Sequence, residues 1–182
     1  MPATAVIETS TSDIAEIYRD AADHFGHVPN FVQVLGTNPA FCRSITDLTI
    51  ELLQEGRVGW AFKELVILKT LRATGVYYSY GAHERLAVEL GNSAHRIGDL
   101  NNSLWQDSPH FEPAERAVFA LIEQIAQDAN DVGDEIWEPL HAGWDEGQLL
   151  ELTAVITTFV NLGRMFDTLG VSDPVLFTRP IA

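Results

Sequence analysis

Apolar residues recur three and four positions apart along most of the chain, which is the spacing of one face of an α-helix. No stretch shows the strict alternation of a strand, and no motif repeats at a fixed period. The pattern predicts an all-α protein. The expected helices cover residues 12–25, 30–35, 39–55, 60–74, 76–90, 93–100, 113–129, 132–140 and 145–169.

Two features set the expected domain organisation. The helix over 60–74 is apolar almost all round, as in a central, mostly buried helix. Residues 1–12 are small and rich in Thr and Ser, so we expect a flexible N-terminal arm followed by one helical domain over residues 13–182. The tail from Val171, with its two prolines, is expected to be extended.

The composition of the chain limits the kinds of molecule that it is expected to bind. The formal net charge is -15, and Lys and Arg form no patch, so a nucleic-acid partner is not expected. The N-terminus lacks the pattern of a signal peptide or membrane span, which predicts a cytoplasmic protein with no membrane partner. Cys42 is the single cysteine, so the chain cannot form an internal dithiol or a thiolate zinc site.

Candidate chemistry lies at the junction of the fourth and fifth expected helices. If the fifth helix starts at Val76, then Val76, Ser79, Tyr80 and His83 share one face of it. Glu64 lies on the preceding helix, and packing of the two helices would bring its carboxylate toward His83, with Ser79 nearby. Glu and His in a half-buried pocket form a plausible proton-transfer pair, although a structural Glu and His pair would look the same.

The helix around Phe62-Lys63-Glu64-Leu65-Val66-Ile67-Leu68-Lys69, followed by a motif ending in His83, resembles the carboxymuconolactone decarboxylase and alkylhydroperoxidase D superfamily. The resemblance covers residues 28–173 and implies an alkylhydroperoxidase D-like helical bundle, built as a homo-oligomer, a trimer or a hexamer. Its other segments are Pro29 to Phe31, Asn38 to Phe41, Phe111 to Ala117, Gln148 to Leu152 and Asn161 to Val171.

Peroxidase members of this superfamily carry Cys-x-x-Cys-x-x-x-His with an upstream Glu. The matching positions here read Val76-x-x-Ser79-x-x-x-His83, with Glu64 retained. Dithiol reduction of a peroxide needs one thiolate to attack oxygen and a second thiol to resolve the sulfenic acid, and neither Val nor Ser can do this. Peroxidase activity is therefore disfavoured.

The decarboxylase branch works without the dithiol and without a cofactor. This resemblance implies a lyase, a decarboxylase or an isomerase, acting on a small carboxylated or ring-derived metabolite. His83 would protonate a carbanionic or enolate carbon while Glu64 orients it. The developing oxyanion would be bound by Ser79 or by a tyrosine hydroxyl of Tyr77, Tyr78 or Tyr80.

The substrate would contact groups near this pair. Tyr77, Tyr78 and Tyr80 are expected to bind a flat ligand, and Arg164 is expected to bind a carboxylate. The histidines show no metal-ligand spacing, so no metal and no cofactor are expected. Trp60, near a helix start, is interpreted as a packing anchor. A non-catalytic ligand-binding or assembly protein on the same scaffold stays open as an alternative.

Overall fold

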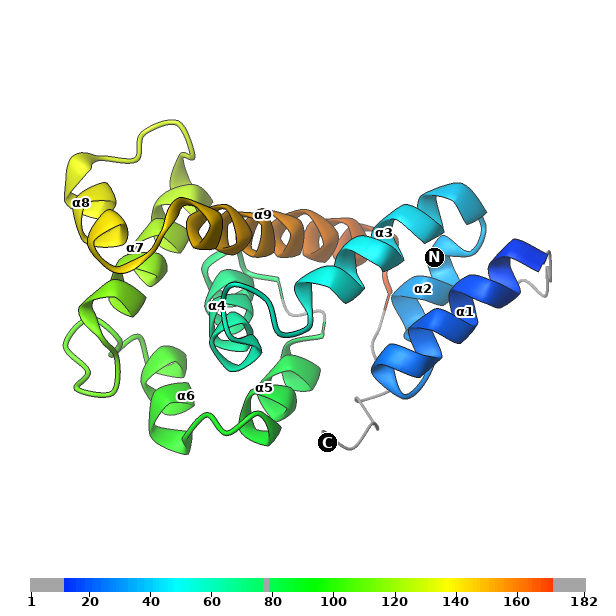
Figure 1. Ribbon diagram of the computed structural model, residues 1–182, viewed down its shortest axis with the longest axis horizontal. Coiled ribbons are helices and arrows are strands. Elements are labelled where there is room, and N and C mark those ends of the chain that lie inside the picture. The colour runs from blue at the N-terminus through cyan, green and yellow to red at the C-terminus, as the bar shows by residue number, and fades with distance from the viewer. Residues whose placement is uncertain (1–11, 77–78, 172–182) are drawn as a thin grey trace.

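The structure is a computed structural model that describes residues 12–76 and 79–171 (Figure 1). These residues form helices without any strand, which confirms the predicted all-α class. The helices are α1 (Ser12–Phe25), α2 (Asn30–Leu35), α3 (Pro39–Leu52), α4 (Trp60–Ala73), α5 (Tyr80–Glu89), α6 (Ala94–Asn101), α7 (Pro113–Gln127), α8 (Asp134–Gly143) and α9 (Glu146–Leu169).

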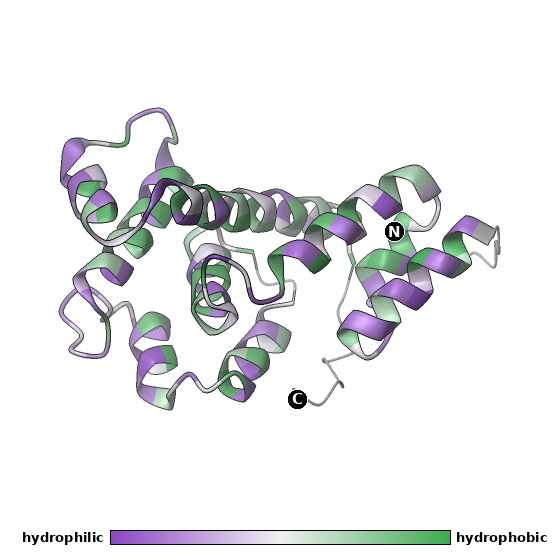
Figure 2. Cartoon of the chain, viewed as in Figure 1, coloured by the Kyte–Doolittle hydropathy of each residue, from purple (hydrophilic) through white to green (hydrophobic). Residues whose placement is uncertain are grey.

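Helix α4 is the centre of the fold. The apolar pattern predicted a mostly buried helix, and in the structure every residue from Phe62 to Leu71 is buried, polar ones included. Helices α5, α7 and α9 pack on its different sides, while α1, α2 and α3 lie together at one end of the long helix α9 and α7 and α8 at the other (Figure 1). Hydrophobic and hydrophilic residues alternate along the outer helices, as green and purple bands in Figure 2, which is the pattern of amphipathic helices.

Two lysines are among the buried residues of α4. The ammonium of Lys63, 1% exposed, pairs with Glu151 of α9 at 2.7 Å. Lys69 pairs with Glu123 of α7 and lies over the ring of Trp105. A buried ammonium requires such a partner because leaving it uncompensated in the interior is costly. The two ion pairs therefore connect α4 to a neighbouring helix on each of two sides.

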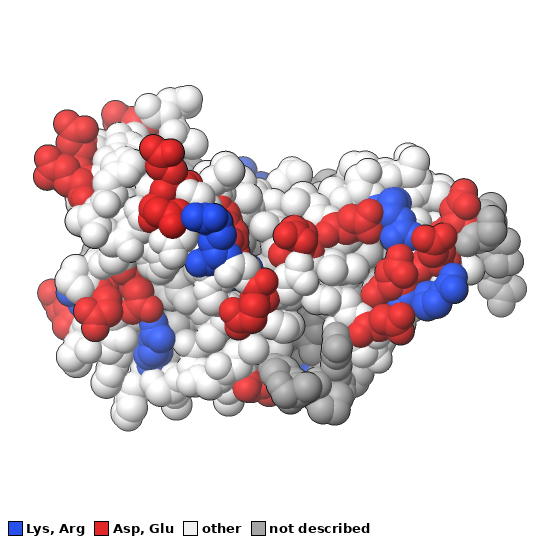
Figure 3. All heavy atoms as spheres, viewed as in Figure 1, with Lys and Arg blue, Asp and Glu red and all other residues white. Residues whose placement is uncertain are grey.

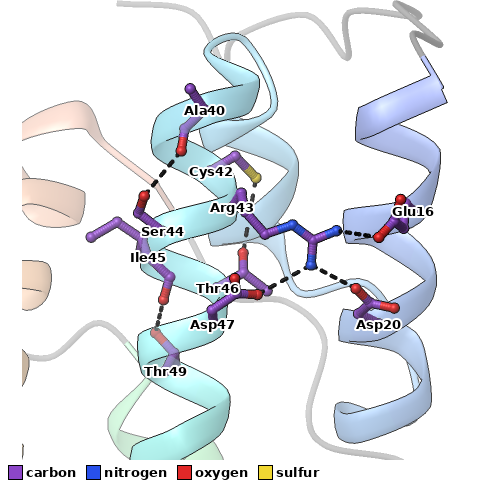
Figure 4. A network of polar contacts seen from close by, with 10 residues as sticks. All are labelled: Glu16, Asp20, Ala40, Cys42, Arg43, Ser44, Ile45, Thr46, Asp47 and Thr49. Atoms are coloured by element: carbon purple, nitrogen blue, oxygen red, sulfur yellow. Dashed lines mark hydrogen bonds and ion pairs between the residues drawn. The ribbon is translucent and has the colours of Figure 1, made fainter.

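Helices α1 and α3 are joined by an ion-pair cluster on Arg43 (Figure 4). The Arg43 guanidinium contacts Asp20 at 2.6 Å, Asp47 at 3.1 Å and Glu16 at 3.3 Å. These partners are largely exposed, so the cluster contributes less to stability than its number of contacts suggests. On the face shown in Figure 3, acidic side chains cover more of the surface than basic ones, in keeping with the net charge of -15.

Helix ends follow the signals in the sequence at several places. Asn38 caps α3 by accepting a hydrogen bond from the Phe41 amide, with Pro39 in the first turn. Asp145 and Gln148 form a capping box at the start of α9. Gly170 ends α9 with φ at 67°, a left-handed conformation that glycine adopts without strain. The expected positions of these three ends are confirmed.

The expected helix over 76–90 was wrong at its start. Helix α4 ends in a Schellman motif, in which Gly75 has φ of 68° and the Val76 amide donates to the Leu71 carbonyl at 2.9 Å. This turn directs Val76 away from a helical path. Helix α5 begins only at Tyr80, after Ser79 at φ 59°. Val76 and Ser79 therefore do not share a helical face with His83, although Ser79 and His83 remain close.

Helix α9 is long and apolar enough, by length and composition alone, to cross a membrane. The core helix of a soluble protein passes the same test. Here Leu152, Val155, Ile156 and Phe159 of α9 are buried within the protein, and the helix packs against α4. This burial is that of a core helix.

Candidate active site

A buried acid–base pair joins α4 to α5. The Nδ1 atom of His83 lies 2.8 Å from Oε2 of Glu64. Glu64 is 0% exposed and His83 only 3% exposed, so water competes little for this hydrogen bond. The structure thus brings together the two residues that the sequence placed at the centre of the predicted chemistry. With Glu64 ionised, Nδ1–H donates to the carboxylate and the second ring nitrogen, Nε2, carries the lone pair.

The other carboxylate oxygen of Glu64 also accepts a hydrogen bond. The indole Nε1–H of Trp60, one turn earlier on α4, donates to Oε1 at 2.9 Å. A buried carboxylate is tolerated only where its lone pairs are satisfied, and here each oxygen has a donor. The interpretation of Trp60 as a packing anchor was therefore incomplete, because the sequence does not show where an indole N–H points.

His83 forms part of the wall of a cavity of about 50 Å³. Most of the wall is apolar or aromatic, and Ser79, His27 and Thr49 supply the other polar side chains. None of the described residues of this wall is Lys or Arg. The full lining is Phe25, His27, Pro29, Phe31, Thr49, Leu53, Leu71, Ser79, His83, Phe159, Leu162, Gly163 and Phe166.

Ser79 holds the amino end of α5 at this cavity. It is the N-cap residue of the helix, and its carbonyl accepts hydrogen bonds from the amides of Ala82 and His83. The first helical amides of α5, which have no partner within the helix itself, lie beside Ser79. Because the amino end of a helix carries a partial positive charge, it can stabilise negative charge that develops on a bound molecule. Ser79 and the amino end of α5 thus lie together at the cavity wall.

Of the four predicted ligand-binding residues, two lie away from the cavity wall and two lie outside the described residues. The Tyr80 hydroxyl donates to Asn101 and is not part of the cavity wall. Burial raises the pKa of the Tyr80 hydroxyl, and a hydrogen bond with Arg72 opposes that rise. Arg164 of α9 is exposed, while Leu162, Gly163 and Phe166 of the same helix face the cavity. Tyr77 and Tyr78 lie outside the described residues.

Several wall residues were not predicted from the sequence. His27 lies between α1 and α2, directly before the Pro29 to Phe31 motif that carries part of the family resemblance. Thr49 of α3 and Phe159 of α9 come from opposite ends of the chain, and the Phe159 ring meets His83 edge to face at 5.1 Å. Proximity to a recognised motif was a usable signal for His27. Thr49 and Phe159 fit ordinary helical periodicity, which gives no sign of a site.

Cys42 lies apart from this cavity. Its thiol is 0% exposed and donates to the Val32 carbonyl at 3.5 Å, with Thr46 next to it (Figure 4). Burial raises the pKa of the Cys42 thiol.

Among the described residues, no three His, Cys, Asp or Glu side chains converge in a way that could hold a metal ion.

The fold is similar to that of several solved structures. A peroxidase-related protein from Silicibacter sp. TM1040 aligns with a TM-score of 0.81 and 13% identity over 96% of this chain and 93% of its own. The alkylhydroperoxidase AhpD core protein from Ralstonia eutropha JMP134 aligns with a TM-score of 0.78 and 19% identity, over 98% of this chain and 97% of its own.

A third similar structure is the debrominase Bmp8, as a C82A variant in complex with 2,3,4-tribromopyrrole. It aligns with a TM-score of 0.78 and 18% identity over 96% of this chain and 94% of its own. No protein-family model and no curated protein sequence matches the chain. Together with the helical arrangement described above, these alignments show that the chain has the alkylhydroperoxidase D-like fold.

Proposed function

We propose that this protein catalyses proton transfer on a small molecule held in the cavity beside His83, without a cofactor. The observation that carries the proposal is the 2.8 Å hydrogen bond between the buried Glu64 and His83, with His83 in the cavity wall. Glu64 orients the imidazole and stabilises its protonated form, and His83 exchanges a proton with the bound molecule through Nε2. Decarboxylation and isomerisation are the reactions that such a pair serves.

Ser79 supports this chemistry at the same wall. Loss of a proton or of carbon dioxide from carbon leaves negative charge on a neighbouring oxygen of the substrate. The Ser79 hydroxyl and the amino end of α5 are the described groups placed to stabilise that charge. Their effect is strongest on charge that appears during the reaction, because hydrogen bonds preorganised for the transition state lower the barrier.

The wall favours a ring-derived substrate over a carboxylated one. Phe25, Phe31, Phe159 and Phe166 contribute apolar surface, whereas no described wall residue carries a positive charge to hold a carboxylate. The debrominase with this fold binds a brominated pyrrole, so the fold accommodates a small ring. The cavity of about 50 Å³ is smaller than the ~150 Å³ that holds benzene, so a ring enters only if side chains of the wall move.

Dithiol peroxide reduction is disfavoured because Cys42 on α3 is buried and has no second cysteine to pair with.

Assembly into a homo-oligomer and a cytoplasmic location remain predictions from the sequence.

The test is turnover of a panel of enolisable ketones, lactones, small ring acids and organic hydroperoxides, followed by NMR. The native protein is compared with His83→Ala and Glu64→Gln. Glu89→Gln is the matched control, because it neutralises an exposed carboxylate on α5, the helix of His83, at a position outside the cavity wall. We expect turnover of at least one ring compound, reduced about 100-fold or more in both site variants and retained in the control.

Two results would overturn the proposal. One is turnover that survives His83→Ala, because the imidazole would then not transfer the proton. The other is reduction of hydroperoxides by the native protein with no activity toward any carbon acid. Binding of ring compounds without any turnover would favour the non-catalytic ligand-binding alternative.

A further inference from the structure

Trp60 contacts Glu64 of the acid–base pair but is not part of the cavity wall. It is the first residue of α4, and its indole N–H donates to Glu64 within the same helix. Two further contacts hold the residue in place. Its main-chain amide donates to Glu55 at 3.2 Å, and its ring stacks on His24 with centroids 6.1 Å apart and planes at 25°.

An indole nitrogen is a donor only, which constrains the carboxyl group it faces. A proton placed on Oε1 of Glu64 would point at the N–H of Trp60, and two donors repel each other. Oε1 is therefore confined to the role of acceptor. Proton exchange with Glu64 can take place only at Oε2, which faces Nδ1 of His83. The indole hydrogen bond also orients the carboxylate, so that Oε2 stays directed at Nδ1 of His83.

We propose that Trp60 is a positioning residue that reserves the Glu64 carboxylate for His83 and so fixes the His83 tautomer with its proton on Nδ1. In this tautomer Nε2 is an acceptor, and the resting site is a base. The first step then takes a proton from carbon to Nε2, and the electron pair stays on the substrate as an enolate. The imidazolium next returns that proton to another carbon, so the resting site can complete an isomerisation with the proton it takes. A decarboxylation takes no proton from carbon and would need one on Nε2 from another source, to protonate the enolate left when carbon dioxide departs.

The inference deepens the proposed function, but its main test needs no substrate. Tautomers of histidine are distinguished by the ¹⁵N chemical shifts of the two ring nitrogens. We would record long-range ¹H–¹⁵N spectra of the native protein and of Trp60→Phe at a pH where the ring is neutral. In the native protein we expect His83 with Nδ1 protonated, and in Trp60→Phe a ratio of this tautomer to the other that is about tenfold lower.

Trp144→Phe is the matched control. The Trp144 indole also donates one hydrogen bond, to the Ala114 carbonyl at 3.0 Å, and its ring also stacks on an aromatic side chain, that of Phe62. The His83 spectrum should be the same in this variant as in the native protein. If Trp60→Phe fails to fold, replacement of Trp60 by 3-benzothienylalanine keeps the shape of the ring and removes only the N–H.

A native His83 with its proton on Nε2, or an unchanged tautomer ratio after loss of the Trp60 N–H, would overturn the inference. A second readout is the split between kcat and KM on any substrate found above: kcat should fall in Trp60→Phe with KM little changed, and both should stay unchanged in Trp144→Phe. An unchanged kcat in Trp60→Phe contradicts the role of Trp60 and leaves the proposed function standing. Absence of turnover contradicts the proposed function and leaves the tautomer result to decide the inference.

Discussion

Val76 packs against Gly163, with its γ-carbons in the space that a β-carbon on Gly163 would need. The contact joins the end of α4 to α9 just before Ser79, and Gly163 itself lies in the cavity wall. Because Gly163 has no side chain, Val76 can approach helix α9 closely. Val76 is 2% exposed, at the position where the resemblance places the first cysteine of peroxidase members.

We expect Gly163→Ala to destabilise the protein by about 1–3 kcal/mol, because the added methyl group overpacks the contact with Val76. Gly98→Ala is the control, since Gly98 lies within α6 and its added β-carbon would meet nothing within 4 Å. That change should be neutral or stabilise the protein by up to about 1 kcal/mol. Urea unfolding measures both, and equal effects of the two substitutions would contradict the packing argument.

Cys42 should be almost unreactive in the folded protein. Its thiol is fully buried, and burial raises its pKa above the ordinary value of 9.0, so little thiolate is present or accessible. We expect alkylation by iodoacetamide to be slower by about a thousandfold in native protein than in urea, followed by mass spectrometry. Ser79→Cys supplies the comparison, because that position is partly exposed at the cavity and its thiol should react quickly. Rapid labelling of Cys42 in native protein would refute this prediction.

Removal of Glu151 should cost more stability than removal of its partner. Glu151→Ala leaves the Lys63 ammonium buried and unpaired, at a cost of about 3–5 kcal/mol. Lys63→Met removes the buried charge, and Glu151 still accepts a hydrogen bond from the Arg57 amide at 2.9 Å. Chemical denaturation of the two variants tests the order of these losses. The double variant Lys63→Met/Glu151→Gln should recover most of the stability lost in Glu151→Ala, and a failure to do so would argue against an unpaired ammonium as the cause.

The charge of Asp145 should make stability depend on pH. Hydrogen bonding from the Gln148 amide, and then Arg57, lowers the pKa of this carboxyl below its ordinary value of 3.8. A lowered folded-state pKa gives a stabilisation that is present above the unfolded value and is lost as pH falls through the folded value. Asp145→Asn keeps a capping side chain without the charge. The native protein should therefore be more stable than Asp145→Asn at neutral pH, and the difference should vanish in acid.

Thermal unfolding across the acidic range measures this difference. Asp23→Asn, which removes the same charge from the exposed face of α1, is the control. A gap between the native protein and Asp145→Asn that persists unchanged in strong acid would rule out the carboxylate as its source.

The helices and the central position of α4 follow from local patterns that the sequence displays. Apolar residues from Phe62 to Leu71 predict burial on every side, and Asn38, Asp145 and Gly170 mark helix ends through capping chemistry that acts within a few residues. The α4 lysines are the exception within this helix. Their burial depends on carboxylates 88 and 54 residues away, which no local pattern reveals.

The candidate site was predictable in its central pair and not in its surroundings. Glu64 and His83 came from a motif resemblance, and the structure places them within hydrogen-bonding distance. The start of α5 was predicted wrongly because helical spacing ran on through Val76, whereas the Schellman motif at Gly75 and the left-handed Ser79 depend on backbone geometry. Trp60 was predicted only as a packing anchor, because the hydrogen bond from its N–H to Glu64 depends on side-chain orientation that the sequence does not display.

The two buried lysines of α4 also restrict how the helices can slide. Contacts among Leu, Ile and Val are interchangeable, so an aliphatic bundle can shift along a helix axis and lose little packing energy. A shift of α4 by one turn would carry Lys63 and Lys69 about 5.4 Å away from their carboxylates and leave both ammoniums stranded in the core. Only one alignment of α4 against α7 and α9 therefore satisfies both charges, and we expect the buried amides of these helices to exchange with solvent together, in a single opening of the fold.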